Sequence, residues 1–330
     1  MTYIIAEMAC SHEGDINKAK TIIDAAGASK ADAIQFQVWK AHNIMSPKHK
    51  DFELLKRIEL TYEAWEGLFL YVKEKFPSME VIACVYDLES INFCEKLGID
   101  AYKIHCADMA NPLIIKAVAS TNKRIDLSVG GSTEIEIKHA IQWIRSKSSS
   151  PIWMMYGLQN FPTPTSDINF DFMDQLSKAF DLPLGYQDHS DPETNAGFWM
   201  PAAAVTKGIT IIEKHITHDR SFKGVDHQAA LNPDEFKEFC DMIRSLDLSS
   251  KKSAYPKVLT DAEAQYRDYS RKSIVLAQSK QASDVIDAND LLFLRTDTMG
   301  MSPENVNTII GKKLNKSKDA YAVILEEDCI

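Results

Sequence analysis

Short, almost continuously apolar segments alternate with longer segments of helical spacing along the first three quarters of the chain. Runs this apolar are typical of parallel strands buried on both faces, and the longer segments repeat apolar positions every three to four residues. The predicted strands are 3–8, 33–38, 79–85, 101–104, 125–128, 152–156, 184–186 and 209–215. The predicted helices are 17–29, 62–76, 88–97, 111–120, 133–146, 171–180, 194–207 and 233–245. Strict alternation of eight strands and eight helices predicts a (β/α)8 TIM barrel.

The pattern changes in an insert and again near the end of the chain. The insert 41–60 contains two histidines and a proline, and we expect it to form a loop on the active face of the barrel. The predicted domains are a barrel at 1–246, a polar linker at 247–269 and a small β-rich module at 270–330. The strand-like segments of the module are 273–276, 285–286, 291–294, 309–310 and 322–325. So short a module has a marginal core, so we expect it to pack against another surface.

Composition narrows the class of protein. The 330 residues are 45% apolar, enough to bury a large core, and the formal net charge is -10. This acidic balance argues against nucleic acid as a partner, because phosphate backbones require a basic surface. The chain shows no membrane-length apolar run and no basic start typical of a signal peptide, and its six cysteines form no CxxC pair. We therefore expect a cytoplasmic globular protein with reduced thiols and no membrane partner.

Polar side chains stand at the ends of several predicted strands or directly after them. They are Glu7, Gln37, Lys103, Ser128, His189 and His215. In a barrel of this class such side chains converge on one pocket at the carboxyl ends of the strands. Taken singly, each residue has an ordinary structural explanation, because a lysine can extend along apolar surface and a histidine can be a buried core residue. His189 and His215, emerging at the same rim, are candidate partners in a metal site.

Motifs throughout the chain resemble those of one family. They are Ile5-Ala-Glu-Met8, Ser11-His-Glu-Gly-Asp15, Ala33-Ile-Gln-Phe-Gln37, Tyr102-Lys-Ile104, Ser128-Val-Gly130, Phe161-Pro-Thr-Pro164, Asp188-His-Ser190, Glu213-Lys-His215 and Asp226-His227. In this order they resemble the bacterial sialic acid synthases and their legionaminic and pseudaminic acid relatives. The tail, with Arg271-Lys-Ser-Ile-Val275, Phe293-Leu-Arg295 and Gly311-Lys-Lys-Leu314, resembles the SAF (antifreeze-like, β-clip) domain of that family. The resemblance covers essentially the full chain.

The resemblance implies a reaction in which phosphoenolpyruvate condenses with the open-chain aldehyde of an N-acetylated amino sugar. The products are a nonulosonic acid, which is a nine-carbon 2-keto acid, and phosphate. His189 and His215 are then the ligands of a divalent metal that makes the aldehyde more electrophilic, and Mn²⁺ suits such an open, oxygen-rich shell. With the metal ligand His215, Glu7 is the other predicted catalytic residue, as the acid-base group. A carboxylate at this position could equally hold a histidine or a water molecule beside the metal.

The matched motifs also imply substrate contacts. Lys103 and Ser128 are expected to bind the anionic groups of phosphoenolpyruvate, together with the backbone of Gly130 and Gly131. The residues expected to receive the sugar hydroxyls are Gln37, Asp108 and Asp226. Asp108 could instead be a cap before the following helix, and Asp226 a turn residue. Arg295 matches an arginine that reaches the sugar pocket of a neighbouring subunit, which implies a domain-swapped homodimer.

Several positions depart from the family pattern. Gln35 replaces a usual lysine, Cys84 and Cys106 replace usual hydroxyl residues, and Gln187 replaces a usual serine. Lost contacts to an anion are costly unless other groups substitute for them. The possible replacement donors are His105, Gln159, Asn160 and Gln187. We therefore expect a rebuilt pocket and leave the sugar acceptor open.

Three functions remain open at this point. The first is the phosphoenolpyruvate-dependent synthase. The second is a metal-dependent aldolase or lyase acting on a related 2-keto sugar acid, or its Schiff-base variant with Lys103 as the nucleophile. The third is a noncatalytic carbohydrate-binding protein that kept the fold. Borohydride trapping with a keto acid separates the Schiff-base route, and sugar binding without turnover identifies the third function.

Overall fold

The computed structural model describes residues 1–250 and 255–330, and the chain divides into two compact units, Met1–Lys251 and Lys252–Ile330. In the first unit eight strands close into one parallel barrel, and β1 pairs with β8 to complete it. The strands are β1 (Tyr3–Glu7), β2 (Ala33–Val38), β3 (Glu80–Val85), β4 (Ala101–Ile104), β5 (Arg124–Ser128), β6 (Ile152–Tyr156), β7 (Leu184–Asp188) and β8 (Ile211–His215). The predicted TIM barrel is therefore confirmed, with each strand within two residues of its expected bounds.

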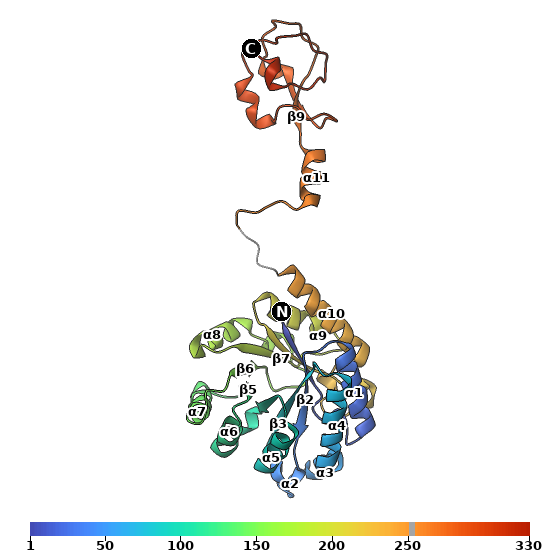
Figure 1. The fold of residues 1–330 in the computed structure, drawn as a ribbon, viewed down its shortest axis with the longest axis vertical. Helices are drawn as coiled ribbons and strands as arrows, with labels where there is room; N and C mark the ends of the chain where they lie inside the picture. Colours follow the sequence, from blue (N-terminus) through green and yellow to red (C-terminus); the bar gives the residue numbers. More distant parts are fainter. Residues whose placement is uncertain (251–254) are drawn as a thin grey trace. The chain divides into compact units, whose positions relative to one another are not determined.

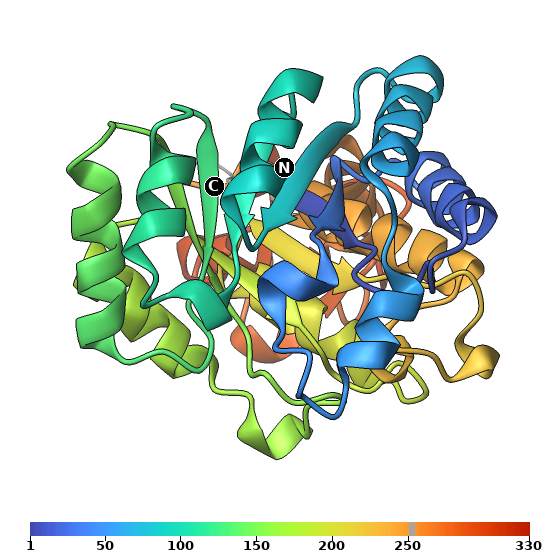
Figure 2. The same ribbon diagram turned by 90° about the horizontal axis from the view of Figure 1, so that it is seen from below.

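Helices surround the strands (Figure 1), and the turned view of Figure 2 shows the same arrangement. Those that match the predicted set are α1 (Ile16–Ala28), α4 (Tyr62–Lys75), α5 (Leu88–Leu97), α6 (Pro112–Ala119), α7 (Glu134–Arg145), α8 (Phe170–Phe180), α9 (Ala196–Thr206) and α10 (Pro233–Ser249). Their apolar faces and the outward-facing strand residues form the main core. None of the helices in the described parts of the chain is long and apolar enough to cross a membrane.

The inside of the barrel is layered, apolar at one level and polar at the next. Ile5, Ile82, Ala101 and Ile211 belong to a buried apolar cluster within the barrel. Two residues further along each of these strands lie Glu7, Cys84, Lys103 and Glu213, all buried. Because alternate residues of a strand face the same side, the second set continues the first toward the carboxyl ends of the strands. The barrel therefore places a polar layer directly above an apolar layer.

The insert after β2 is helical, so the predicted loop was wrong in its conformation. It contains α2 (Ala41–Ile44) and α3 (Phe52–Ile58). Phe52 and Ile58 are buried in a small cluster with Trp39 of the preceding segment and Cys10 of the loop after β1. The apolar contacts of this insert therefore stabilise two short helices.

The predicted linker 247–269 also contains helical structure. Helix α10 continues to Ser249, and α11 spans Asp261–Ser270. The Thr260 hydroxyl accepts from the Glu263 backbone N–H, and the Glu263 carboxylate accepts from the Thr260 N–H, forming a capping box that starts α11. Residues 251–254 of the linker prediction lie outside the described part of the chain.

The second unit has a small core of its own. Its antiparallel strands β9 (Ser273–Leu276) and β10 (Leu291–Leu294) confirm two of the predicted strand segments. The other three are not assigned as strands, although Val285 and Val323 each make an isolated bridge. Ile286, Ile309 and Ile324 nevertheless pack with these strands in one buried cluster. Each of these three segments therefore contributes a buried residue to the core without forming a regular strand.

Asp126 is fully buried in β5, and it leads to a pH-dependent stability prediction. Burial raises the pKa of its carboxyl group to about 6, against the opposing effect of the Arg124 guanidinium, whose Nε donates to Asp126 Oδ1 at 3.0 Å. Because the folded-state pKa exceeds the unfolded value, folding stability falls as the pH rises from about 4 to about 6. The Asp126→Asn variant should not lose this stability. We therefore expect its free energy of unfolding, relative to that of the wild type, to increase by on the order of 3 kcal/mol as the pH rises from about 4 to about 7.

Denaturant unfolding of both proteins across this pH range checks the prediction. The exposed Asp268, replaced by asparagine, is the matched control, and its curve should stay parallel to that of the wild type. Parallel curves for Asp126→Asn and the wild type would contradict the assigned cause.

Candidate active site

A cavity of about 230 Å³ opens at the carboxyl ends of the barrel strands. Its lining residues come from the polar layer and from the loops above it: Glu7, Gln37, Lys103, His105, Ser128, Gln159, Phe161, Gln187, His189, Glu213, His215 and Asp226. Eight of the residues predicted for the site therefore lie around one cavity. This is the face where barrels of this class carry their chemistry.

Three buried charged groups form the floor of this cavity. Lys103 Nζ lies 2.7 Å from Glu213 Oε1 and 3.4 Å from Glu7 Oε2. Burial alone would lower the pKa of Lys103, but the two carboxylates outweigh it and raise the pKa above its ordinary value. Burial raises the pKa of Glu7 to about 8, with Lys103 opposing the shift and Glu213 adding to it. Lys103 is therefore a protonated cation beside two acidic groups.

The two predicted metal histidines lie next to each other, edge to face, in the lining of the cavity. Their ring centroids are 5.2 Å apart, and Phe161 packs against both rings. His189 Nδ1 lies 2.7 Å from the Leu158 carbonyl oxygen, which can only accept, so Nδ1 carries the proton and Nε2 keeps its lone pair. Burial lowers the pKa of both histidines, and the neighbouring His189 lowers that of His215 further. Both imidazoles are therefore neutral, which is the form that binds metal ions.

Glu213 completes a possible ligand set that the sequence analysis missed. One donor atom each from His189, Glu213 and His215 lies within 4.8 Å of the others. Glu213 Oε2 and His215 Nδ1 are buried and have no hydrogen-bond partner among the described residues. Glu213 and His215 are two positions apart in β8, so they face the same side, and this spacing was the available signal. Two imidazoles and a carboxylate fit a divalent transition metal.

Hydrogen bonds connect this floor to β5 and β7. Ser128 Oγ donates to Gln187 Oε1 at 2.9 Å, and Gln187 Nε2 donates to Glu213 Oε1 at 3.0 Å. Gln187 stands where the family usually has a serine, and its longer side chain reaches the Glu213 carboxylate. A bound anion could accept a hydrogen bond from the Ser128 hydroxyl only if that hydroxyl gave up its hydrogen bond to Gln187.

Gln37 and the backbone of Ala9 both contact the Glu7 carboxyl group. Gln37 Nε2 donates to Glu7 Oε1 at 3.4 Å, and the Ala9 N–H donates to the same oxygen at 2.6 Å. Tyr86 in turn donates to Gln37 Oε1 at 3.3 Å. The Glu7 carboxyl group is therefore held in one orientation toward the cavity.

Two other positions that depart from the family pattern are Gln35 and Cys84. Both polar atoms of the buried Gln35 side chain have no hydrogen-bond partner in the described structure. Burial raises the pKa of the Cys84 thiol to about 12, so this side chain stays neutral beside Lys103. Neither residue lines the cavity, which indicates that the lost family donors were not replaced at these positions.

Two predicted site residues of the first unit do not line this cavity. Asp108 accepts a hydrogen bond from Asn111 Nδ2 at 2.8 Å, just before α6, as expected for a residue that supports a helix cap. Asn160 is exposed and accepts from the Thr163 hydroxyl. Arg295 belongs to the second unit and follows β10.

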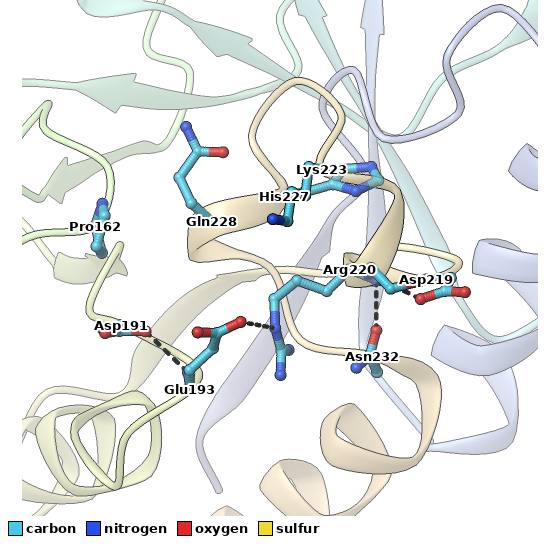
Figure 3. Close-up of a pocket in the computed structure, with 10 residues that line it drawn as sticks. Pro162, Asp191, Glu193, Asp219, Arg220, Lys223, His227, Gln228 and Asn232 are labelled. Carbon is cyan, nitrogen blue, oxygen red and sulfur yellow. Dashed lines mark hydrogen bonds and ion pairs between the residues drawn. The ribbon is translucent and has the colours of Figure 1, made fainter.

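A second cavity of about 550 Å³ is lined by residues of the loops after β6, β7 and β8 (Figure 3). Adjacent chain positions line the two cavities, because Pro162 follows Phe161 and His227 follows Asp226. Arg220 is its central cation, and it forms an ion pair with Glu235, with Glu193 also 3.7 Å away. Charged or polar residues make up most of this cavity's lining, and its volume exceeds that of the first cavity.

Comparison with known proteins places the chain among enzymes of one type. Residues 22–255 match the sequence profile described as the NeuB family. The N,N'-diacetyllegionaminic acid synthase of Campylobacter jejuni is 30% identical over 98% of this chain and 99% of its own. Human N-acetylneuraminate-9-phosphate synthase is 26% identical over 98% of this chain and 92% of that protein. The crystal structure of N-acetylneuraminic acid synthetase from Leptospira borgpetersenii, in complex with citrate, has a TM-score of 0.72 at 27% identity and covers 81% and 91% of the two chains.

Proposed function

Because the chain belongs to the NeuB family of nonulosonic acid synthases, we propose that it joins phosphoenolpyruvate to the open-chain aldehyde of an N-acetylated amino sugar. Carbon 3 of phosphoenolpyruvate bonds to the aldehyde carbon, a water oxygen bonds to carbon 2, and phosphate leaves from carbon 2. The product is a 2-keto acid longer by three carbons. The observation that carries the proposal is the pair of neutral, adjacent imidazoles above the buried Lys103.

His189, Glu213 and His215 would hold the divalent metal, for which we propose Mn²⁺. When bound, the ion supplies Lewis acidity toward the aldehyde oxygen. The fixed tautomer of His189 and the unpartnered Glu213 Oε2 and His215 Nδ1 support this ligand set, because buried polar atoms are otherwise almost always paired.

The protein's own charges define where each substrate binds. Lys103 is the buried cation of the cavity, and we assign to it the carboxylate or phosphate of phosphoenolpyruvate. Ser128 and the backbone of Gly130 and Gly131 complete that anion site. A side chain at Gly130 would place its Cβ 2.0 Å from the Gly157 oxygen, so only glycine allows these two loops to approach. Glu7, held by Ala9 and Gln37, is assigned to proton transfer with the attacking water.

We assign the sugar to Gln37, Gln159 and Asp226, which line the same cavity. At about 230 Å³ this cavity is smaller than most small-molecule sites, so the sugar chain would extend into the second cavity around Arg220. Asp108 and Asn160 would join the sugar site only after leaving their present partners.

The second unit offers support for a swapped homodimer in which it completes the site of a partner barrel. On β10, the apolar Leu292, Phe293 and Leu294 are exposed by 37%, 39% and 37%, and the exposed Arg295 follows them. A contiguous apolar strand of this kind is typical of a surface that another molecule covers. We propose that this unit is the SAF domain, that it packs on the partner's barrel, and that Arg295 reaches the partner's sugar.

Replacing Arg295 with alanine tests this arrangement. We expect the KM for the sugar to rise by roughly 10-fold or more, because a charge-assisted contact contributes about 1.5–3 kcal/mol. The KM for phosphoenolpyruvate should stay within about 2-fold, since Lys103 binds that substrate. Initial-rate kinetics with each substrate varied in turn checks this, with Arg271→Ala as the control in the same unit. Equal loss for both substrates would contradict the assignment.

The Schiff-base aldolase is disfavoured by the environment of Lys103. A nucleophilic lysine needs a lowered pKa, whereas Glu213 and Glu7 raise the pKa of this one. Phosphate release from phosphoenolpyruvate, assayed with Mn²⁺ and a panel of N-acetylated hexosamines, tests the synthase directly. Sugar-dependent phosphate release supports it. Sugar binding without phosphate release by any panel member, or borohydride trapping of a keto acid on Lys103, overturns it.

A further inference from the structure

A second group of potential metal ligands lies outside the cavity described above. Glu13, in the loop after β1, and His218 and His227, in the loop after β8, bring one donor atom each within 4.8 Å of the others. We call these three residues the outer cluster. It shares no residue with the inner set of His189, Glu213 and His215, and none of the reaction steps assigned above uses it.

His218 is oriented as a ligand would be. Its Nδ1 lies 3.1 Å from the Ser11 carbonyl oxygen, and because a carbonyl only accepts, Nδ1 carries the proton. The lone pair is then on Nε2, which is buried, lies 3.9 Å from Glu13 Oε2 and has no hydrogen-bond partner among the described residues. Metal-binding histidines commonly donate their other ring nitrogen to a carbonyl in this way. The same arrangement fixes His189 in the inner site.

Gly224 leaves open the space that the other two ligands face. A Cβ at this position would lie 2.3 Å from Glu13 Oε1 and 2.8 Å from His227 Nε2. Glu13 Oε1 and His227 Nε2 therefore converge on a gap that exists because residue 224 has no side chain. His227 itself is buried, with its Nε2 3.1 Å from the Thr217 hydroxyl.

The charges around the outer cluster are compatible with a cation. Lys18 forms an ion pair with Glu13 through Oε2, and its half-exposed side chain can turn into solvent when a stronger cation arrives. Without an ion, Lys18 is a cation paired with Glu13.

We propose that the outer cluster is a second divalent metal site, suited to a Zn²⁺-class ion by its two imidazoles and one carboxylate. The ion would join the loop after β1 to the loop after β8. Asp226, which lines the inner cavity, immediately precedes His227, so the outer ion would fix the loop that presents this residue to the sugar. The site therefore acts by holding a loop, and its existence does not depend on the proposed reaction.

Counting zinc ions on the full-length protein tests this site without any activity measurement. The protein is stripped with a chelator, loaded with Zn²⁺, desalted and analysed for metal content. His218→Asn keeps an amide N–H for the Ser11 carbonyl and removes the Nε2 ligand, and Gly224→Ala fills the gap. The exposed His139, replaced by asparagine, is the matched control.

We expect His215→Ala to retain one zinc ion and the double variant His215→Ala with His218→Asn to retain none. His218→Asn and Gly224→Ala should each hold one ion fewer than the wild type, whereas His139→Asn should match the wild type. If His189, Glu213 and His215 bind no metal but the outer cluster does, the wild type holds one zinc ion and His218→Asn holds none. Unchanged zinc content in folded His218→Asn and Gly224→Ala would overturn the proposal and show that the outer cluster serves packing only.

Discussion

Replacing His215 with alanine is expected to abolish turnover. His215 ends β8, lies next to His189 at a ring separation of 5.2 Å and shares its cavity with Glu213. Without its imidazole the inner metal would lose one of two nitrogen ligands, and the several kcal/mol that Lewis acidity contributes would be lost with it. We expect kcat to fall by at least about 100-fold, the effect of about 2.7 kcal/mol.

Phosphate release in the presence of Mn²⁺, together with Mn²⁺ binding by calorimetry, checks this expectation. His139→Ala changes an exposed histidine of α7 and serves as the control. Loss of Mn²⁺ binding should accompany the loss of rate, while the thermal unfolding of the metal-free variant reports on its folding. Full activity in His215→Ala would remove this residue from the site.

Replacing Lys103 with methionine is expected to have the second largest effect, on both stability and turnover. The side chain is 4% exposed, and its ammonium group is the cation between Glu213 and Glu7, each 1% exposed. Methionine has a similar length but leaves the buried Glu213 carboxylate without its counter-charge. Breaking a buried pair in this way costs about 3–5 kcal/mol, and phosphoenolpyruvate would lose its main charged contact as well.

Denaturant unfolding of Lys103→Met and of the double variant Lys103→Met with Glu213→Gln distinguishes these two consequences. The double variant removes the orphaned charge, so it should recover part of the lost free energy of unfolding. It should not recover phosphate release, because the anion site stays neutral. Wild-type stability in Lys103→Met would contradict the central position given to this ion pair.

The barrel could be predicted from the sequence because its local signals agree with its tertiary structure. Buried parallel strands such as Ile152–Tyr156 are continuous apolar runs, and a helix follows each of the eight strands. The helices of the insert 41–60 were missed because their apolar residues, such as Phe52 and Ile58, become buried only against Trp39 and Cys10, which lie elsewhere in the chain.

The sequence predicted where the candidate site lies, but not which of its side chains contact one another. Residues at strand ends, such as Lys103 and His215, could be placed because the fold fixes that end of the barrel. Glu213 was overlooked because it lies inside β8 and not at its end, and only the barrel interior shows that it meets Lys103. Asp108 does not line the cavity, and its contact with Asn111 agrees with the alternative that it supports the cap of the following helix.

The most direct test of the account is a crystal structure of the Mn²⁺-loaded enzyme with anomalous data collected near the manganese edge. We expect a manganese peak at coordination distance from His189 Nε2 and from the His215 ring, with the Glu213 carboxylate beside it. No peak between these rings in crystals of active, Mn²⁺-loaded enzyme, or rings turned out of the cavity, would contradict it.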